Sequence, residues 1–139
     1  MDRPELFDFR GDHLELTGAY CNPKSAQSPH PPILVGGRST PTLRVAAEHA
    51  DLWNYPGDDL DDAVGRSALL DRLGAEIGNP DSIIRSIVLP VSYRYPAGTR
   101  DAWRRAVGAG FGHIVLGLAA PYPADVTRWV ADEVITTLS

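Results

Sequence analysis

Four short apolar runs, each followed by a stretch with helical periodicity, constrain the fold of this chain more than any other feature. The apolar runs are "ILVGG", "DLWNY", "SIIRSIVLPV" and "HIVLGL". The helical stretches are "PTLRVAAEHA", "LDDAVGRSALLDRLGAEIG", "RDAWRRAVGAG" and "ADVTRWVADEVITTL". Nearly continuous apolar strands are typical of a sheet covered on both faces. The alternation therefore predicts βα units around a parallel sheet.

The second helical stretch shows how the core is expected to form. Its apolar residues recur at helical spacing and should share one buried stripe: Leu60, Ala63, Val64, Leu70, Leu73 and Ile77. Gly78 and Pro80 should end this helix. The closing stretch, 124–138, is expected to turn Val126, Trp129, Val130 and Val134 inward.

Residues 1–32 have a different character. Apolar and polar residues alternate on either side of "RGDH" within residues 5–20, which predicts a small β-hairpin. An "RGD" triplet also occurs in adhesion motifs, but in this acidic chain we interpret it as the hairpin turn. Four prolines in residues 21–32 keep the connector extended. We expect one domain over residues 1–139, with the hairpin and Pro-rich connector at 1–32 and four βα units at 33–139.

The charge, the cysteine content and the lack of a long apolar run limit the partners and the cell compartment that we expect for this chain. A formal net charge of -5 argues against a nucleic-acid partner. The single cysteine, Cys21, has no intramolecular disulfide partner, which suits a reducing compartment. No apolar run approaches the roughly 18 residues of a membrane span, and the start "MDRPELFDFRGD" is too polar for a signal peptide. These features predict a cytoplasmic protein without a membrane partner.

The first strand ends in a glycine pair that has two interpretations. Gly36 and Gly37 permit backbone angles closed to other residues and let a ligand approach the main chain. Ser39 or Thr40 can cap the following helix, whose free amides would then favour an anion, and Arg38 adds a charged fork suited to phosphate. Alternatively, the segment is a plain strand-to-helix turn. Local sequence alone leaves both interpretations open.

Other polar residues carry weaker signals. Four histidines are scattered without metal-ligand spacing: His13, His30, His49 and His113. Four aspartates cluster at the start of the second helical stretch and are expected to complement the helix dipole on a solvated face: Asp58, Asp59, Asp61 and Asp62. We predict no metal site. Trp103 and Trp129 are expected in the core, whereas Trp53 is either a buried aromatic or a ligand contact.

From Asp8 to about Asn54 the chain resembles the luciferase-like family of flavin- and deazaflavin-dependent oxidoreductases. The resemblance is carried by the hairpin "FDFRGDHLELTGA", the segment "NPKSAQSPHPPILVGG", the helix "TPTLRVAAEHAD" and the following "ADLWN". It continues more weakly through "EIGNPDSIIRSI" to "GFGHIVLGL". Most of the chain is therefore covered, with several motifs in the family's order.

This resemblance implies a partial (βα)8 TIM barrel, of which the chain supplies the four C-terminal βα units preceded by the hairpin. It implies FMN or the deazaflavin coenzyme F420 as cofactor and a small organic substrate, in an oxidoreductase or monooxygenase reaction. "ILVGG" becomes the fifth barrel strand. The residues carried over to the cofactor phosphate are Gly36, Gly37, Arg38, Asn54 and Tyr55, with Gly117 as a weaker addition. No catalytic residue can be assigned.

Only "MDRPEL" precedes the hairpin, so the family's first four strands are expected to be absent. A half barrel exposes two strand edges and one sheet face, which favours a homodimer or a partner that completes the barrel. Two alternatives stay open beside the oxidoreductase. One is a non-catalytic truncated half barrel, an association module or remnant. The other is a phosphate- or nucleotide-binding module without redox activity.

Overall fold

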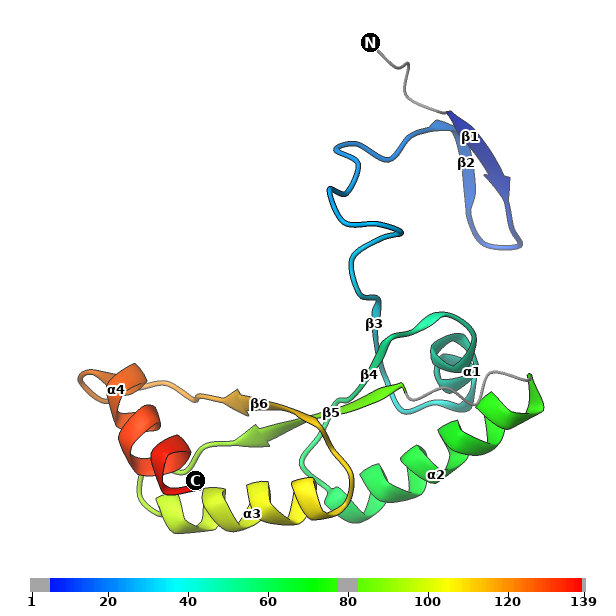
Figure 1. Cartoon of the computed structure of the whole chain (residues 1–139). Helices are drawn as coiled ribbons and strands as arrows, with labels where there is room; N and C mark the ends of the chain where they lie inside the picture. Colours follow the sequence, from blue (N-terminus) through cyan, green and yellow to red (C-terminus); the bar gives the residue numbers. More distant parts are fainter. Residues whose placement is uncertain (1–5, 78–82, 139) are drawn as a thin grey trace. The chain divides into compact units, whose positions relative to one another are not determined.

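A computed structural model describes residues 6–77 and 83–138 of the chain (Figure 1). The chain divides into two compact units, one ending at Pro31 and the other beginning at Pro32. The predicted helix end at Gly78 and Pro80 lies outside the described residues.

The first unit is the predicted hairpin. Strands β1 (Phe7–Arg10) and β2 (Glu15–Ala19) pair antiparallel, and the amide of Gly11 donates to the carbonyl of Leu14 over 2.8 Å to close the turn. Arg10 and Glu15, which are partners across the strands, also form an ion pair at 3.0 Å. The "RGD" triplet therefore leads into a hairpin turn, as predicted.

The second unit contains a four-stranded parallel sheet whose strands follow chain order. The strands are β3 (Leu34–Gly36), β4 (Leu52–Tyr55), β5 (Ile84–Pro90) and β6 (His113–Gly117). The helices are α1 (Thr40–His49), α2 (Leu60–Glu76), α3 (Pro96–Gly108) and α4 (Val126–Val130), followed by a π-helical segment (Ala131–Ile135) and a 3-10 turn (Thr136–Leu138). The predicted alternation of strands and helices is confirmed.

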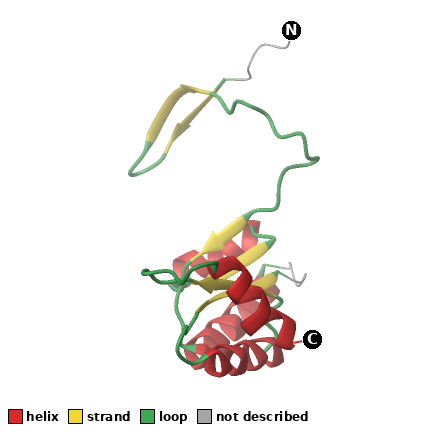
Figure 2. Cartoon of the chain, turned by 90° about the vertical axis from the view of Figure 1, so that its left-hand side faces the viewer, coloured by secondary structure: helices red, strands yellow, loops and turns green. Residues whose placement is uncertain are grey.

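The sheet is singly wound. A doubly wound sheet reverses its strand order at a switch point, whereas the order here runs from β3 to β6 without reversal. Helices α2 and α3 lie along the same side of β5 and β6 (Figures 1 and 2). Residues of α1, α2 and α3 join Trp53, Tyr55 and Ile87 of the strands in one buried cluster. This cluster is the core of the unit.

The opposite sheet face differs from the expectation of two covered faces. Side chains alternate along a strand, so Leu34 and Ile84 point away from the helices that bury Trp53 and Ile87. Leu34 is 52% exposed and Ile84 is 48% exposed. Among the described residues, no helix covers this face, which we call the open face. The strands of the sheet are therefore nearly continuously apolar in sequence, although helices pack on only one of its two faces.

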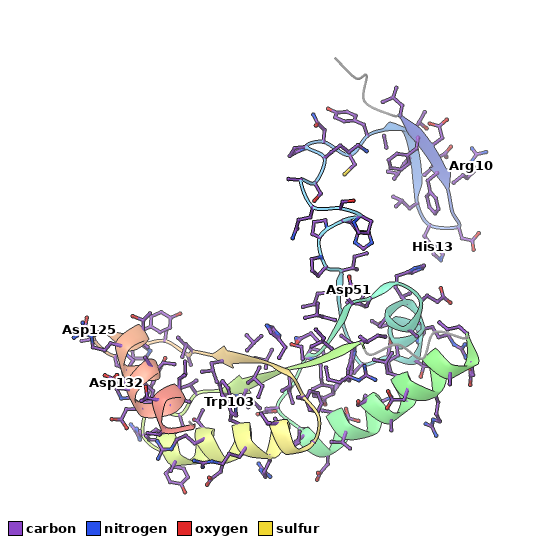
Figure 3. All side chains as sticks on the ribbon, in the orientation of Figure 1. Arg10, His13, Asp51, Trp103, Asp125 and Asp132 are labelled. Carbon is purple, nitrogen blue, oxygen red and sulfur yellow. The ribbon has the colours of Figure 1, made fainter. Side chains whose placement is uncertain are left out.

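Asp51 ties together the amino ends of three strands (Figure 3). Its carboxylate accepts the amide of Ile33 at 2.7 Å, and its own amide donates to the Ile33 carbonyl at 2.9 Å. The Asp51 carbonyl accepts from Ile84 at 2.9 Å. Asp51 therefore helps to fix the register of β3, β4 and β5 at their amino ends, whereas the glycine turn lies at the carboxyl end of β3.

Two helices depart from their predicted stripes. On α2, Ala63, Leu70 and Leu73 are buried as predicted, but Val64 is 41% exposed and Ile77 is 45% exposed. Val64 follows Ala63 directly, and one step of about 100° around the helix turns it away from the core. The last predicted helix, 124–138, is α-helical only over Val126–Val130. Val130 and Val134 are nevertheless buried, as predicted.

Candidate functional site

The turn between β3 and α1 needs glycine at its second position. Gly37 has a φ of 145°, a conformation that other residues rarely adopt. A Cβ atom at Gly37 would lie 2.6 Å from Cγ2 of Thr42. By contrast, a Cβ at Gly36 would approach nothing closer than the Asn54 carbonyl, at 4.0 Å. Gly37 is thus required by the fold, whereas Gly36 leaves open space at the carboxyl end of β3.

Two hydrogen bonds with residues of β4 fix the position of this turn. The Gly37 amide donates to the Asn54 carbonyl at 3.1 Å, and the indole Nε1 of Trp53 donates to the Gly37 carbonyl at 2.7 Å. Trp53 is fully buried and meets Tyr55 edge-on, with ring centroids 6.2 Å apart. The backbone of the turn is therefore fixed by an aromatic core residue. Of its two predicted roles, Trp53 has that of a buried aromatic.

Helix α1 begins immediately after the turn. The Ser39 hydroxyl accepts the amide of Thr42 at 3.3 Å and lies 2.8 Å from the Thr42 hydroxyl. Pro41 occupies the first turn, where its missing amide hydrogen costs nothing. The amide of Thr40 is one of the first-turn donors that have no intrahelical acceptor. The structure confirms Ser39 as the cap, with the positive end of the helix dipole beside exposed Arg38.

A polar side-chain network connects this turn to α2. The hydroxyl of Tyr55 donates to Oδ2 of Asp62 at 2.7 Å, and Nε of Arg66 lies 3.3 Å from Oδ1 of the same carboxylate. Burial and the Asp62 carboxylate raise the pKa of Tyr55, while the neighbouring Arg38 guanidinium opposes that rise. The hydrogen bond from Tyr55 lowers the pKa of Asp62, with Arg66 and Arg38 contributing in the same direction. Tyr55 is therefore neutral and Asp62 ionised near neutral pH.

Asn54 offers an acceptor on the other side of β4. Its side chain alternates with Trp53 and Tyr55 and so belongs to the open face. The Oδ1 atom of Asn54 is buried, and within residues 6–77 and 83–138 no donor reaches it. A buried acceptor without a donor costs free energy. Such an atom suits a ligand hydroxyl or N–H group at this end of the sheet.

A pocket of about 430 Å³ lies beyond the carboxyl ends of β4, β5 and β6. Its lining is mostly apolar, and Asp58 supplies the one ionisable side chain. The lining residues are Pro56, Gly57, Asp58, Val88, Pro90, Gly117, Leu118 and Ala119. Parallel α/β sheets place their ligand sites at the carboxyl ends of the strands. The pocket is therefore where the topology predicts one, and it includes Gly117.

The structure brings together some of the predicted site residues. The Arg38 guanidinium acts to lower the pKa of Tyr55, and the Gly37 amide donates to the Asn54 carbonyl. Sequence reasoning assigned Asp62 only to the helix dipole and missed its bond to Tyr55. The spacing of Asp62 and Arg66, four residues apart on a helix, indicates the contact between those two side chains but not the bond to Tyr55. Asp59, expected only to complement the helix dipole, also caps α2 by accepting from the amides of the two residues that follow Leu60.

His113 is the first residue of β6, and its Nδ1 lies 2.8 Å from the buried Ser86 hydroxyl. In the part of the chain that the structure describes, no group of three His, Cys, Asp or Glu side chains could hold a metal ion. None of the described helices is long and apolar enough to cross a membrane.

The luciferase-like monooxygenase family matches the chain over residues 2–132 of its 139. The chain therefore belongs to this family. Its coarse function follows, an oxidoreductase of the monooxygenase kind, and members of the family commonly use flavin or a deazaflavin. The fold agrees at the level of a mixed α/β unit with a parallel four-stranded sheet.

Proposed function

We propose that this chain is the cofactor-phosphate-binding part of a flavin- or deazaflavin-dependent oxidoreductase. The observation that carries the proposal is the Gly37 turn, which the bond from Trp53 fixes at the carboxyl end of the sheet and which the exposed Arg38 follows directly. Family membership supplies the reaction class. FMN or coenzyme F420 would supply the redox chemistry, acting on a small organic substrate.

The residues at this edge fit such a cofactor. Arg38 and the first-turn amides of α1 suit a phosphate group. Gly36 leaves room for that group to approach the backbone. Asn54 Oδ1 would accept a hydrogen bond from a ribityl hydroxyl, because an acceptor cannot bind a phosphate oxygen directly. Apolar walls such as Val88 and Leu118 suit the flat face of a ring system.

Two roles fall to the chain's own residues. Tyr55 keeps its proton near neutral pH and donates it to Asp62, so its hydroxyl adds no charge to the site. Trp53 donates a hydrogen bond to the Gly37 carbonyl. This bond fixes the backbone from which the next two residues, Arg38 and Ser39, project. The chain thus binds and orients the cofactor.

Residues 33–139 are proposed to form the C-terminal half of an eight-stranded barrel, within one domain that includes residues 1–32. The singly wound order of β3 to β6 supports this architecture. The open face with Leu34, Ile84 and Val115 would be the inner wall of that barrel. Four further βα units, from a second copy of the chain or from a partner, would cover it.

The exposed apolar side chains of the open face also favour a second candidate function. A non-catalytic module that associates through this face would use the same residues without binding a cofactor. The two candidates differ in cofactor affinity, whereas both predict association.

Titration of the full chain with FMN and with coenzyme F420, followed by fluorescence, separates these candidates. The oligomeric state should be recorded on the same samples by light scattering. Saturable binding at tens of micromolar supports the oxidoreductase. An associated chain that binds neither cofactor supports the association module instead.

A further inference from the structure

Three polar residues stand side by side across the open face of the sheet. The register pairs Asn54 of β4 with Ser86 of β5, and Ser86 with His113 of β6. Residues paired in a parallel sheet point to the same face, so all three share the face of Asn54. Adjacent strands lie about 4.8 Å apart, which puts each side chain within reach of the next. We call Asn54, Ser86 and His113 the polar row.

Ser86 bonds to only one of its two neighbours in the polar row. Its hydroxyl lies 2.8 Å from Nδ1 of His113, whereas Oδ1 of Asn54 is buried and no donor among the described residues reaches it. Ser86 is fully buried, so its single proton needs an acceptor within the protein. In the part of the chain that the structure describes, that acceptor is Nδ1 of His113. Neutral His113 therefore carries its own proton on Nε2.

Protonation of His113 reverses this bond. An imidazolium carries a proton on both ring nitrogens and accepts no hydrogen bond. Its Nδ1 must then donate to Oγ of Ser86, which frees the proton of Ser86 for another acceptor. The unpartnered Oδ1 of Asn54 belongs to the next side chain of the row. The Ser86 hydroxyl would turn to this atom and occupy it.

No other charged side chain of the described strands shares the open face with His113. The open-face residues along β5 and β6 are otherwise uncharged: Ile84, Val88, Pro90, Val115 and Gly117. Arg85 points to the opposite face and pairs with Asp71 of α2. Asp51, at the amino ends of the strands, has its carboxylate bound to the amide of Ile33. A charge change on this face between about pH 8 and pH 5.5 therefore belongs to His113.

We propose that His113 is a positioning residue that controls, through Ser86, whether the acceptor of Asn54 is free for a ligand hydroxyl. With neutral His113 the acceptor is free, and with protonated His113 the Ser86 hydroxyl occupies it. This inference rests on the proposed function, in which Asn54 accepts a hydrogen bond from a ribityl hydroxyl. It adds a regulation by pH to that site.

NMR of the full chain without ligand tests the switch itself. The 13Cγ shift of Asn54, followed from about pH 8 to pH 5.5, should move together with the titration of the His113 ring. Ser86→Ala removes the hydroxyl that connects the two, so the Asn54 shift should stay nearly constant while His113 titrates. His49→Gln, at an exposed histidine of α1, is the matched control and should leave the Asn54 response intact. An Asn54 shift that ignores His113, or that follows it equally in Ser86→Ala, overturns the proposal.

Riboflavin and lumiflavin test the consequence for binding. Lumiflavin has the same ring system with a methyl group in place of the ribityl chain, so only riboflavin uses Asn54. The wild-type chain should bind riboflavin about three- to tenfold more weakly at pH 5.5 than at pH 8, and lumiflavin binding should change less. Ser86→Ala should keep the tighter riboflavin binding at both pH values. His113→Ala should show the weaker binding at both, because the Ser86 proton is then always free.

The outcomes separate this inference from the proposed function. A pH effect on riboflavin that persists in Ser86→Ala overturns the roles of Ser86 and His113 and leaves the ribityl site standing. Riboflavin binding that does not change with pH, although the Asn54 shift does, removes the ribityl chain from Asn54 and overturns the control of binding. Absence of riboflavin binding at both pH values contradicts the proposed function, and the control of binding fails with it.

Discussion

The indole Nε1 of Trp53 donates a hydrogen bond to the carbonyl of Gly37 over 2.7 Å. This bond joins the buried core under β4 to the turn from which Arg38 and Ser39 project. Binding of a cofactor at the turn would then depend on residues that never contact the ligand.

Replacing Gly37 with alanine should destabilise the chain by about 2 kcal/mol, because alanine disfavours a φ of 145° and its Cβ would clash with Thr42. Urea unfolding measures the change. Gly65→Ala is the matched control. Gly65 lies within α2 with nothing within 4 Å of a Cβ there, so the same substitution should stabilise by about 0.5–1 kcal/mol. Equal effects at the two glycines would contradict the account of the turn.

Trp53→Phe should lower the free energy of unfolding by about 2–4 kcal/mol. The substitution leaves the Gly37 carbonyl without its donor and opens space in a fully buried position. Trp103→Phe serves as the control, since Trp103 packs against the core from α3 and is only half-buried (Figure 3). A loss at Trp53 no greater than the loss at Trp103 would show that the bond contributes little.

Arg85 links β5 to α2 through a charged contact in which the arginine is shielded from water and its partner Asp71 is exposed. Its guanidinium pairs with Asp71, its Nε donates to Ser67 at 2.9 Å, and its side chain is 14% exposed. Arg85→Met should cost about 1–3 kcal/mol in thermal or urea unfolding. Arg104→Met, at an exposed ion pair with Asp101, should cost under about 0.5 kcal/mol. Similar costs for both variants would contradict this difference.

Acid stability should depend on Asp62. The Tyr55 hydrogen bond places the folded pKa of Asp62 below its ordinary value of 3.8, so the ionised form is favoured in the folded chain. The resulting stability is present above pH 3.8 and is lost as the pH falls through the folded pKa. Wild type should therefore exceed Asp62→Asn in stability near neutral pH, and the two should converge in acid.

Urea unfolding as a function of pH measures this convergence. Asp61→Asn should keep the wild-type dependence, because it leaves the bond between Tyr55 and Asp62 in place. A constant gap between wild type and Asp62→Asn across the acid range would mean that the bond does not favour the ionised carboxylate.

The alternation of strands and helices was predictable because each element carries its own periodicity. The cap at Ser39 and the hairpin turn were predictable for the same reason, since both depend on neighbouring residues only. It was not predictable that only one face of the sheet is covered. The apolar run of β5 places Ile84 and Ile87 on opposite faces, and it gives no information on which element covers each face. A continuously apolar strand indicates that its side chains are suited to burial, but it does not show which element covers each face of the sheet.

Within the candidate site, the glycine pair and Arg38 stood out in the sequence because their chemistry is local. The bond from Tyr55 to Asp62 spans seven residues and depends on how α2 returns over the end of β4. The bond from Trp53 to Gly37 depends on the register of two parallel strands. Tertiary placement decides both contacts, so neither could be predicted from spacing.

The central claim is that the turn between β3 and α1 binds the phosphate of the cofactor. Comparing the dissociation constants of FMN and riboflavin tests it most directly, because the two differ only in the phosphate. The wild-type chain should bind FMN more tightly, and Arg38→Ala should weaken FMN binding by about tenfold while riboflavin binding stays unchanged. Arg44→Ala, an exposed arginine further along α1, should change neither. Equal affinity for FMN and riboflavin in the wild-type chain, or no effect of Arg38→Ala on FMN, would contradict the claim.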